Sequence, residues 1–96
     1  MKNLTDIEEI LRRYKPILRE KYKVKEIGIF RSYARGEQSE TSDIDILVQL
    51  YEPMGWEFLD LKEFLESILN NNVDLVTNNA LKSRIRDKIL KEVVYA

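Results

Sequence analysis

The sequence predicts an α/β fold (α+β in some classifications): a small mixed β-sheet flanked by helices. Three short runs rich in branched apolar residues are typical of strands, and they lie at residues 25–31, 44–50 and 73–77. Apolar residues at helical spacing fill residues 5–20, 56–69 and 80–93. The predicted order is helix, strand, short helix, strand, helix, strand, helix.

Residues 5–20 predict a helix, because Ile7, Leu11 and Leu18 recur on one face. Thr5 and Glu8 have the spacing of a capping box, which makes Thr5 the expected N-cap. Pro16 has no amide hydrogen, so we expect it to kink or divide this helix.

Residues 12–25 form a basic run, with seven Lys or Arg side chains (12, 13, 15, 19, 21, 23 and 25) against the single acid Glu20. Most such runs are solvated helix faces. A run of this kind also suits docking of an acidic partner or RNA. The residues by themselves leave both interpretations open.

The second long helix, residues 56–69, ends at three asparagines, because Asn tolerates the left-handed conformation at a helix C-terminus. The helix joins strands 44–50 and 73–77 into a right-handed parallel βαβ unit. Strands 25–31 and 44–50 are expected to be antiparallel. This topology brings Asp74 to the end of the sheet where Asp43 and Asp45 enter, with neighbouring strands roughly 4.8 Å apart. Three carboxylates are therefore expected to converge there.

The central stretch, residues 28–49, reads as strand, tight turn, short helix, polar loop and strand. Asp43 and Asp45 lie two residues apart, so a strand would present them on one face, roughly 6.6 Å apart along the chain. Like charges this close repel unless a cation lies between them. The structural alternatives are a strand-capping Asp43 and an Asp45 that keeps an edge strand soluble.

The turn between the first two strands offers candidate phosphate contacts. Ser32 is expected to be the N-cap of the short helix, where free amide groups also suit phosphate. Arg35 has two equally weighted interpretations, a phosphate contact or a loop contact to Glu37. Gly36 is expected to be the C-cap.

Composition limits the chemistry. A chain of 96 residues suits one small domain, residues 1–96. It has no Cys and no His, which excludes disulfides, zinc sites and catalysis by those residues. A metal would need oxygen ligands, which favours Mg²⁺ or Mn²⁺. The net charge of −1 argues against a general nucleic-acid binder. No signal peptide or membrane-spanning run is visible, so a cytoplasmic location is expected.

The order Phe30-Arg31-Ser32, then Asp43-Ile44-Asp45-Ile46, resembles the signature of the DNA polymerase beta-like nucleotidyltransferase superfamily. The wording SYARGE…SDIDILV is similar to the minimal nucleotidyltransferases (MNT proteins) of bacteria and archaea, and the similarity extends over most of the chain. In that signature a Gly stands where this chain has Arg31. An Arg there is bulkier, and its guanidinium can grip phosphate.

The resemblance implies the nucleotidyltransferase fold and Mg²⁺-dependent transfer of a nucleoside monophosphate, expected to be AMP from ATP. The acceptor would be a hydroxyl of a partner protein. Two metal ions are implied. The implied catalytic residues and metal ligands are Asp43, Asp45 and Asp74. The candidate nucleotide-binding residues are Arg31, Ser32 and Arg35.

MNT proteins of this type commonly act as antitoxins beside a HEPN-domain toxin, so such a partner is implied, and homo-oligomers stay open. Because of Arg31, a non-catalytic antitoxin or regulatory binding module with a vestigial metal site is an alternative. A small RNA-modifying nucleotidyltransferase that uses the basic run is a third interpretation.

Overall fold

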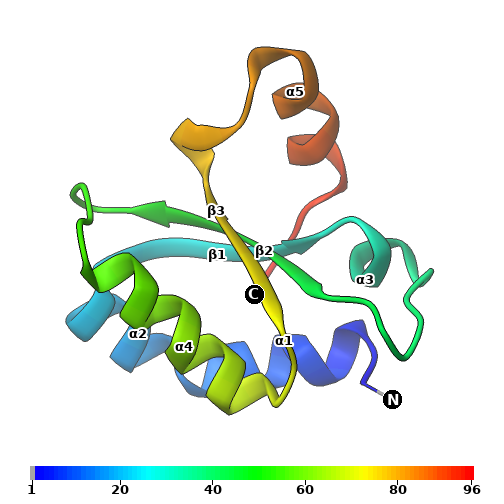
Figure 1. Ribbon diagram of the computed structural model, residues 1–96, viewed down its shortest axis with the longest axis horizontal. Coiled ribbons are helices and arrows are strands. Elements are labelled where there is room, and N and C mark those ends of the chain that lie inside the picture. Colours follow the sequence, from blue (N-terminus) through cyan, green and yellow to red (C-terminus); the bar gives the residue numbers. More distant parts are fainter. Residues whose placement is uncertain (1) are drawn as a thin grey trace.

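A four-stranded mixed sheet forms the centre of the computed structural model, which describes residues 2–96 (Figure 1). Its strands are β1 (Val24–Phe30), β2 (Ile44–Leu50), β3 (Val73–Thr77) and β4 (Val94–Tyr95), in the spatial order β3-β2-β1-β4. The pairing of β1 with β2 is antiparallel and that of β2 with β3 is parallel, as predicted. β4 pairs antiparallel with β1 and was not predicted, because two residues are too few to show a strand period.

Helices cover both faces of the sheet (Figure 1). Below it in that view lie α1 (Leu4–Arg13), α2 (Lys15–Tyr22) and α4 (Glu57–Leu69). Above it lies α5 (Ser83–Glu92), which follows the short 3-10 helix η1 (Asn78–Ala80). The four-residue helix α3 (Ser32–Arg35) opens the connection from β1 to β2.

The predicted first helix is divided into α1 and α2, and Pro16 lies in the first turn of α2, where a missing amide hydrogen costs nothing. The predicted capping box was wrong. Asn3 is the N-cap: its Oδ1 accepts from the Asp6 amide at 3.0 Å, and Asp6 Oδ2 accepts from the Asn3 amide at 3.1 Å. Asn and Asp satisfy free amides as well as Thr and Glu do, so spacing alone did not distinguish Asn3 from Thr5.

The last helix also begins later than predicted, at Ser83 rather than residue 80, because residues 78–80 form η1. The second long helix spans Glu57–Leu69, and its C-cap Asn70 has a φ of 50°, as the asparagine run predicted.

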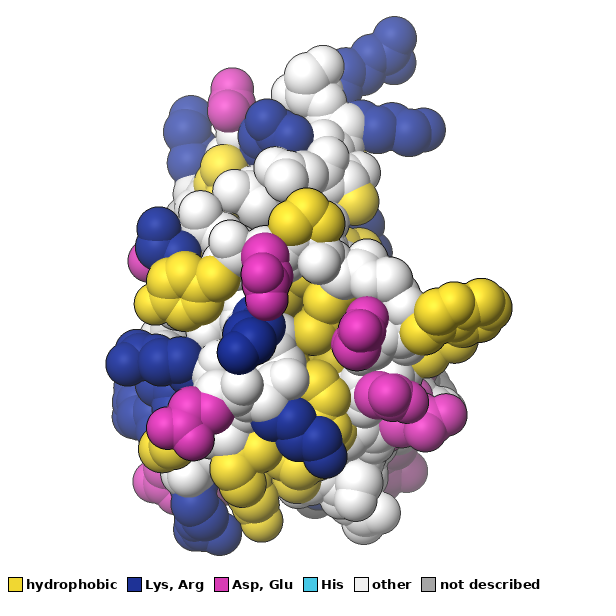
Figure 2. Space-filling model, turned by 90° about the vertical axis from the view of Figure 1, so that its left-hand side faces the viewer, with side chains coloured by type: hydrophobic (Ala, Val, Ile, Leu, Met, Phe, Trp, Pro, Cys, Tyr) yellow, Lys and Arg dark blue, Asp and Glu magenta, His cyan; other side chains and the backbone are white. Residues whose placement is uncertain are grey.

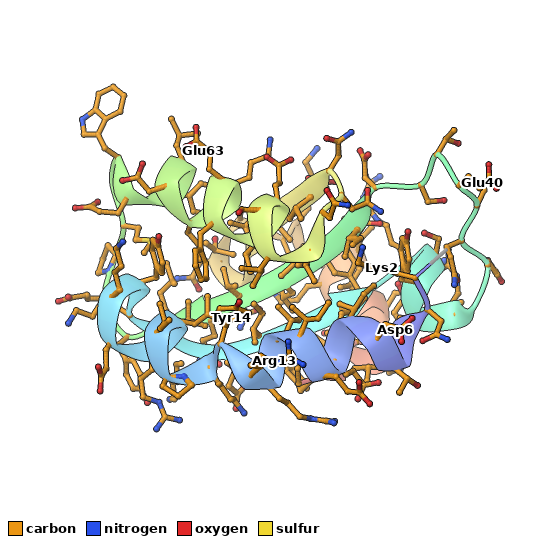
Figure 3. All side chains as sticks on the ribbon, turned by 90° about the horizontal axis from the view of Figure 1, so that it is seen from below. Lys2, Asp6, Arg13, Tyr14, Glu40 and Glu63 are labelled. Atoms are coloured by element: carbon orange, nitrogen blue, oxygen red, sulfur yellow. The ribbon has the colours of Figure 1, made fainter. Side chains whose placement is uncertain are left out.

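Two apolar clusters hold the layers together. The larger lies between the sheet and helices α1, α2 and α4, with Ile7, Leu11, Leu61 and Leu65 fully buried. Figure 3 shows α4 beside the α1–α2 pair, with Tyr14 between them; its ring meets Phe64 edge to face, 5.7 Å between centroids. The smaller cluster, beneath α5, consists of Phe30, Leu47, Leu81 and Ile89. With both faces covered, the ends of the strands are where polar groups of the sheet can meet solvent or a ligand. Within residues 2–96, no helix has the length and apolar character needed to cross a membrane.

Gly28 lets β4 close on β1. A Cβ at this position would lie 2.6 Å from Val93 Cγ2 and 3.1 Å from the Val94 carbonyl oxygen. We expect Gly28→Ala to lower the free energy of unfolding by about 1–3 kcal/mol through overpacking. Urea denaturation measures this change. Gly55→Ala is the control, because its Cβ would meet only Glu57 Oε2 at 3.7 Å. Equal stability of the two variants would show that β4 contributes little.

Candidate active site

The parallel pairing of β2 and β3 sets two carboxylates side by side. In the register of the two strands, Asp45 lies opposite Asp74. Asp45 is buried, with 8% of its surface exposed, whereas the Asp74 side chain is 49% exposed. The predicted convergence is thus confirmed for these two residues.

Asp43 lies at the same end, just before β2 begins, and is exposed. It is near enough for its charge to act on Asp45. Across residues 2–96, however, no three Asp, Glu, His or Cys side chains are grouped closely enough to hold a metal ion. The structure therefore brings two of the three predicted carboxylates together and leaves Asp43 at the rim.

The guanidinium of Arg31 lies against the carboxylate pair. Its Nη1 is 3.5 Å from Asp45 Oδ1 and 3.7 Å from Asp74 Oδ2. The guanidinium carbon lies 5.2 Å from the centre of the Phe30 ring, within the range of a cation–π contact. The side chain that replaces the Gly of the signature thus points into the acidic site and supplies it with a cation.

Burial of Asp45 raises its pKa from the ordinary 3.8 to about 6, because a charged carboxylate is poorly solvated there. The charge of Arg31 acts in the opposite direction and lowers the pKa, while Asp74 and Asp43 raise it further. The net upward shift means that the favourable charge of Arg31 does not offset the loss of solvation that burial imposes on the Asp45 carboxylate.

The turn after β1 differs from the prediction at Ser32. Arg31 is the N-cap of α3, and Ser32 is the first helical residue. Arg31 has a φ of 58° and a ψ of −135°, backbone angles that glycine adopts far more readily than other residues. Gly36 is the C-cap, with a φ of 70°, as predicted.

Glu92, at the end of α5, is the partner that the sequence did not reveal. Its Oε1 accepts from the Arg31 amide at 3.0 Å, and its Oε2 pairs with Arg35 Nη1 at 3.1 Å. Arg35 also pairs with Glu37 at 3.2 Å, so the loop contact considered for Arg35 is present. A carboxylate in the last turn of a helix is disfavoured by the helix dipole. An acidic residue at the C-terminal end of the last predicted helix was therefore the one sequence feature that could have indicated a basic partner for Glu92.

A groove of about 440 Å³ lies away from this site, at the opposite end of β2. Residues from the end of β2, the following turn and η1 line it, among them Tyr51, Met54, Phe58 and Asn78. Size therefore does not identify the reactive centre. The carboxylate pair is the candidate reactive centre, because paired carboxylates at the end of a sheet offer oxygen ligands and a proton acceptor.

The donor atoms of this site are of the kind that binds a divalent cation, with Asp45 and Asp74 side by side and Asp43 at the rim. All candidate ligands are carboxylate oxygens, which Mg²⁺ and Mn²⁺ prefer. A cationic side chain already lies against two of them, so this position in the structure attracts positive charge.

A small mixed sheet with carboxylates at the start of two neighbouring strands defines an α/β protein of the nucleotidyltransferase class. The family model for the nucleotidyltransferase domain matches residues 11–96. The protein adenylyltransferase MntA of Thermococcus cleftensis is 50% identical over 96 residues, which cover 99% of this chain and 97% of MntA. The chain belongs to the nucleotidyltransferase domain family and, within it, to the minimal nucleotidyltransferases homologous to MntA.

Solved structures show the same fold. A toxin–antitoxin complex with AMP-PNP contains a chain of 27% identity and TM-score 0.69; the match covers 98% of this chain and 72% of that one. The complex of the tri-AMPylated HEPN toxin of Shewanella oneidensis with an MNT antitoxin contains a chain of 22% identity and TM-score 0.66, matched over 93% of this chain and 70% of that one. At its lower identity the second match supports the fold alone.

In metal-free protein we expect Asp45 to make stability fall as the pH rises from about 4 to about 7. Its native pKa of about 6 exceeds the ordinary 3.8, so in this window the native state binds more protons than the unfolded state, and deprotonation favours unfolding. The effect is at most about 3 kcal/mol, because one pKa unit corresponds to about 1.4 kcal/mol.

Urea denaturation of the wild type and Asp45→Asn in EDTA, at pH 4.5 and 7.5, measures the effect. The variant should lose this slope and be the more stable protein at pH 7.5. The same slope in both proteins would mean that Asp45 titrates normally.

Proposed function

We propose that this chain transfers AMP from ATP to a hydroxyl of a HEPN-domain partner protein and thereby acts as its antitoxin. Two relatives support the activity: MntA, 50% identical, is a protein adenylyltransferase, and the matched chain of 27% identity is part of a toxin–antitoxin complex with AMP-PNP. The observation that carries the proposal in this chain is the pairing of Asp45 with Asp74 around a cation.

Asp43, Asp45 and Asp74 are the residues that would hold Mg²⁺. When bound, Mg²⁺ neutralises charge on the phosphates and lowers the pKa of the attacking hydroxyl. The position of the buried Asp45 is well defined, because its strand, β2, is paired with β1 on one side and with β3 on the other. Asp74 is half exposed and so can meet an acceptor that arrives from solvent.

The reaction is a displacement at the α-phosphorus of ATP. The acceptor oxygen forms a bond to this phosphorus, the bond to the bridging oxygen of the β-phosphate breaks, and pyrophosphate leaves. We assign Asp74 the proton of the acceptor hydroxyl, because it is the most accessible member of the pair.

Arg31, Ser32 and Arg35 are the proposed phosphate contacts. All three belong to the turn from β1 into α3, next to the carboxylates. The Arg31 amide and the Arg35 guanidinium already bind a carboxylate of Glu92, an oxyanion as phosphate is. Phosphate at these donors therefore has to replace Glu92.

The basic run is the proposed docking face. Arg13 and Arg19 are exposed on α1 and α2, whereas Arg12 is engaged by Glu8 at 2.8 Å. Figure 2 shows Lys and Arg side chains along its left edge, and acidic side chains beside exposed apolar ones on its right. Exposed apolar side chains accompany acidic ones at the start of α4, where Trp56 is the N-cap and Leu59 lies in the first turns beside Glu57 and Asp60. The two surfaces differ in charge, so salt dependence distinguishes them.

We expect Asp45→Asn to abolish transfer of labelled AMP to the product of the adjacent open reading frame, because it replaces the buried carboxylate by a neutral amide that binds a divalent cation poorly. Melting of the metal-free variant at pH 7 should stay level or rise, since one of two crowded anions is gone. Asp60→Asn, an exposed position on α4, is the control with the same charge change. Full transfer by Asp45→Asn would contradict the proposed role of the site.

We expect the double variant Arg13→Glu, Arg19→Glu to associate with the HEPN partner at least about tenfold more slowly at low salt, because exposed charges mainly steer encounter. The salt dependence of association should flatten. Stopped-flow or surface-based kinetics measures both. If binding is unchanged here but lost in Trp56→Ala, α4 is the interface.

A further inference from the structure

Arg31 is the only side chain of the described residues recorded in ion pairs with both carboxylates of the acidic pair. A single nitrogen, Nη1, lies 3.5 Å from Asp45 and 3.7 Å from Asp74. The two carboxylates come from neighbouring strands, so this nitrogen lies at the end of the sheet, against both of the carboxylates that are proposed as metal ligands.

The backbone of Arg31 adopts a strained conformation at the point where its side chain reaches the carboxylates. A φ of 58° with a ψ of −135° is unfavourable for any residue with a Cβ, and such conformations persist only where the surroundings impose them. Here the Arg31 amide is held by Glu92 at 3.0 Å and its guanidinium by two carboxylates and the Phe30 ring. The arginine is thus fixed at both its backbone and its charged end.

We propose that Arg31 is a built-in counter-ion of the acidic site, which occupies the cation position in the metal-free protein and has to leave it when a divalent metal binds. This inference rests on the proposed function, because it takes Asp45 and Asp74 as metal ligands. The physical reason is competition: a guanidinium and a metal ion cannot share the same carboxylate oxygens, and their positive charges repel.

If Arg31 has to move when metal binds, it links the binding of metal to the binding of nucleotide. The Arg31 side chain is 47% exposed and long, so its guanidinium, once displaced, can turn toward solvent. A polyphosphate offers it new oxyanion partners, which arginine binds in bidentate fashion. Metal and triphosphate then favour the same displaced position of Arg31, and each should promote binding of the other.

Mn²⁺ titration without nucleotide, followed by electron paramagnetic resonance, tests the proposal. Arg31→Gln removes the charge and keeps the Cβ, whereas Arg31→Gly removes both. We expect each variant to bind Mn²⁺ at least about tenfold more tightly than the wild type, the change that corresponds to a modest coupling. Arg19→Gln is the matched charge control, since α2 lies beside the other end of β1, and its affinity should stay within about threefold of the wild type.

Thermal melting gives a second readout that does not depend on activity. In EDTA, Arg31→Gln should melt below the wild type, because it loses the counter-ion and retains the backbone strain. Addition of Mn²⁺ should then raise its melting temperature by more than it raises that of the wild type. Arg31→Gly should melt above Arg31→Gln in EDTA, because the strain is relieved.

Each outcome bears on the proposal. Equal Mn²⁺ affinity of the wild type and Arg31→Gln would overturn it. Tightening in Arg31→Gly alone would also overturn it, because the effect would then come from the backbone and not from the charge. Asp45→Asn is the reference without the buried carboxylate. If the wild type and both Arg31 variants bind Mn²⁺ no better than Asp45→Asn does, the metal site of the proposed function is contradicted.

Discussion

The parallel pairing of β2 with β3 is the interaction on which the site depends. Asp45 lies opposite Asp74 because the apolar residues on either side, such as Ile44 and Ile46, are fully buried. A slip of one residue would move these side chains out of the larger apolar cluster to the other face of the sheet and turn Asp45 into that cluster, so the hydrophobic effect fixes the register. The same apolar packing therefore forces two carboxylates together at the point where the strands emerge from the core.

Charge around that point is arranged in two opposed sets. The acidic pair receives the guanidinium of Arg31, and the basic turn of Arg31 and Arg35 receives the carboxylate of Glu92. Glu92 is 61 residues from Arg31 in the chain. The C-terminal segment therefore makes two contacts: Glu92 of α5 binds the turn after β1, and β4 adds a strand to the edge of the sheet. Under the proposed function, each set contains a group that a ligand would replace: the Arg31 cation would give way to a metal ion, and the Glu92 carboxylate to phosphate. Without metal or nucleotide, the charged groups at this end of the sheet are thus paired with one another.

The parts of the fold with a strong local signal were predictable. β2 and β3 were predicted with their observed bounds, because runs of branched apolar residues between polar turns allow few other structures. The division at Pro16 and the caps at Gly36 and Asn70 followed from backbone chemistry. The N-cap at Asn3 was missed, because several nearby residues cap equally well. β4 was missed, because these two residues form a strand only through hydrogen bonds to the free edge of β1, at a point where Gly28 has no Cβ to obstruct them.

By itself, the sequence determined the class of chemistry and the candidate carboxylates. Without Cys or His, and with Asp43 and Asp45 at the mouth of an apolar strand, only oxygen ligands and their metals were available. Tertiary structure decided which of these groups meet. It placed Asp45 against Asp74, turned Arg31 toward them rather than away, and brought Glu92 to the turn. These contacts join residues from different elements, and their free energy depends on distance and burial that local residue patterns do not contain.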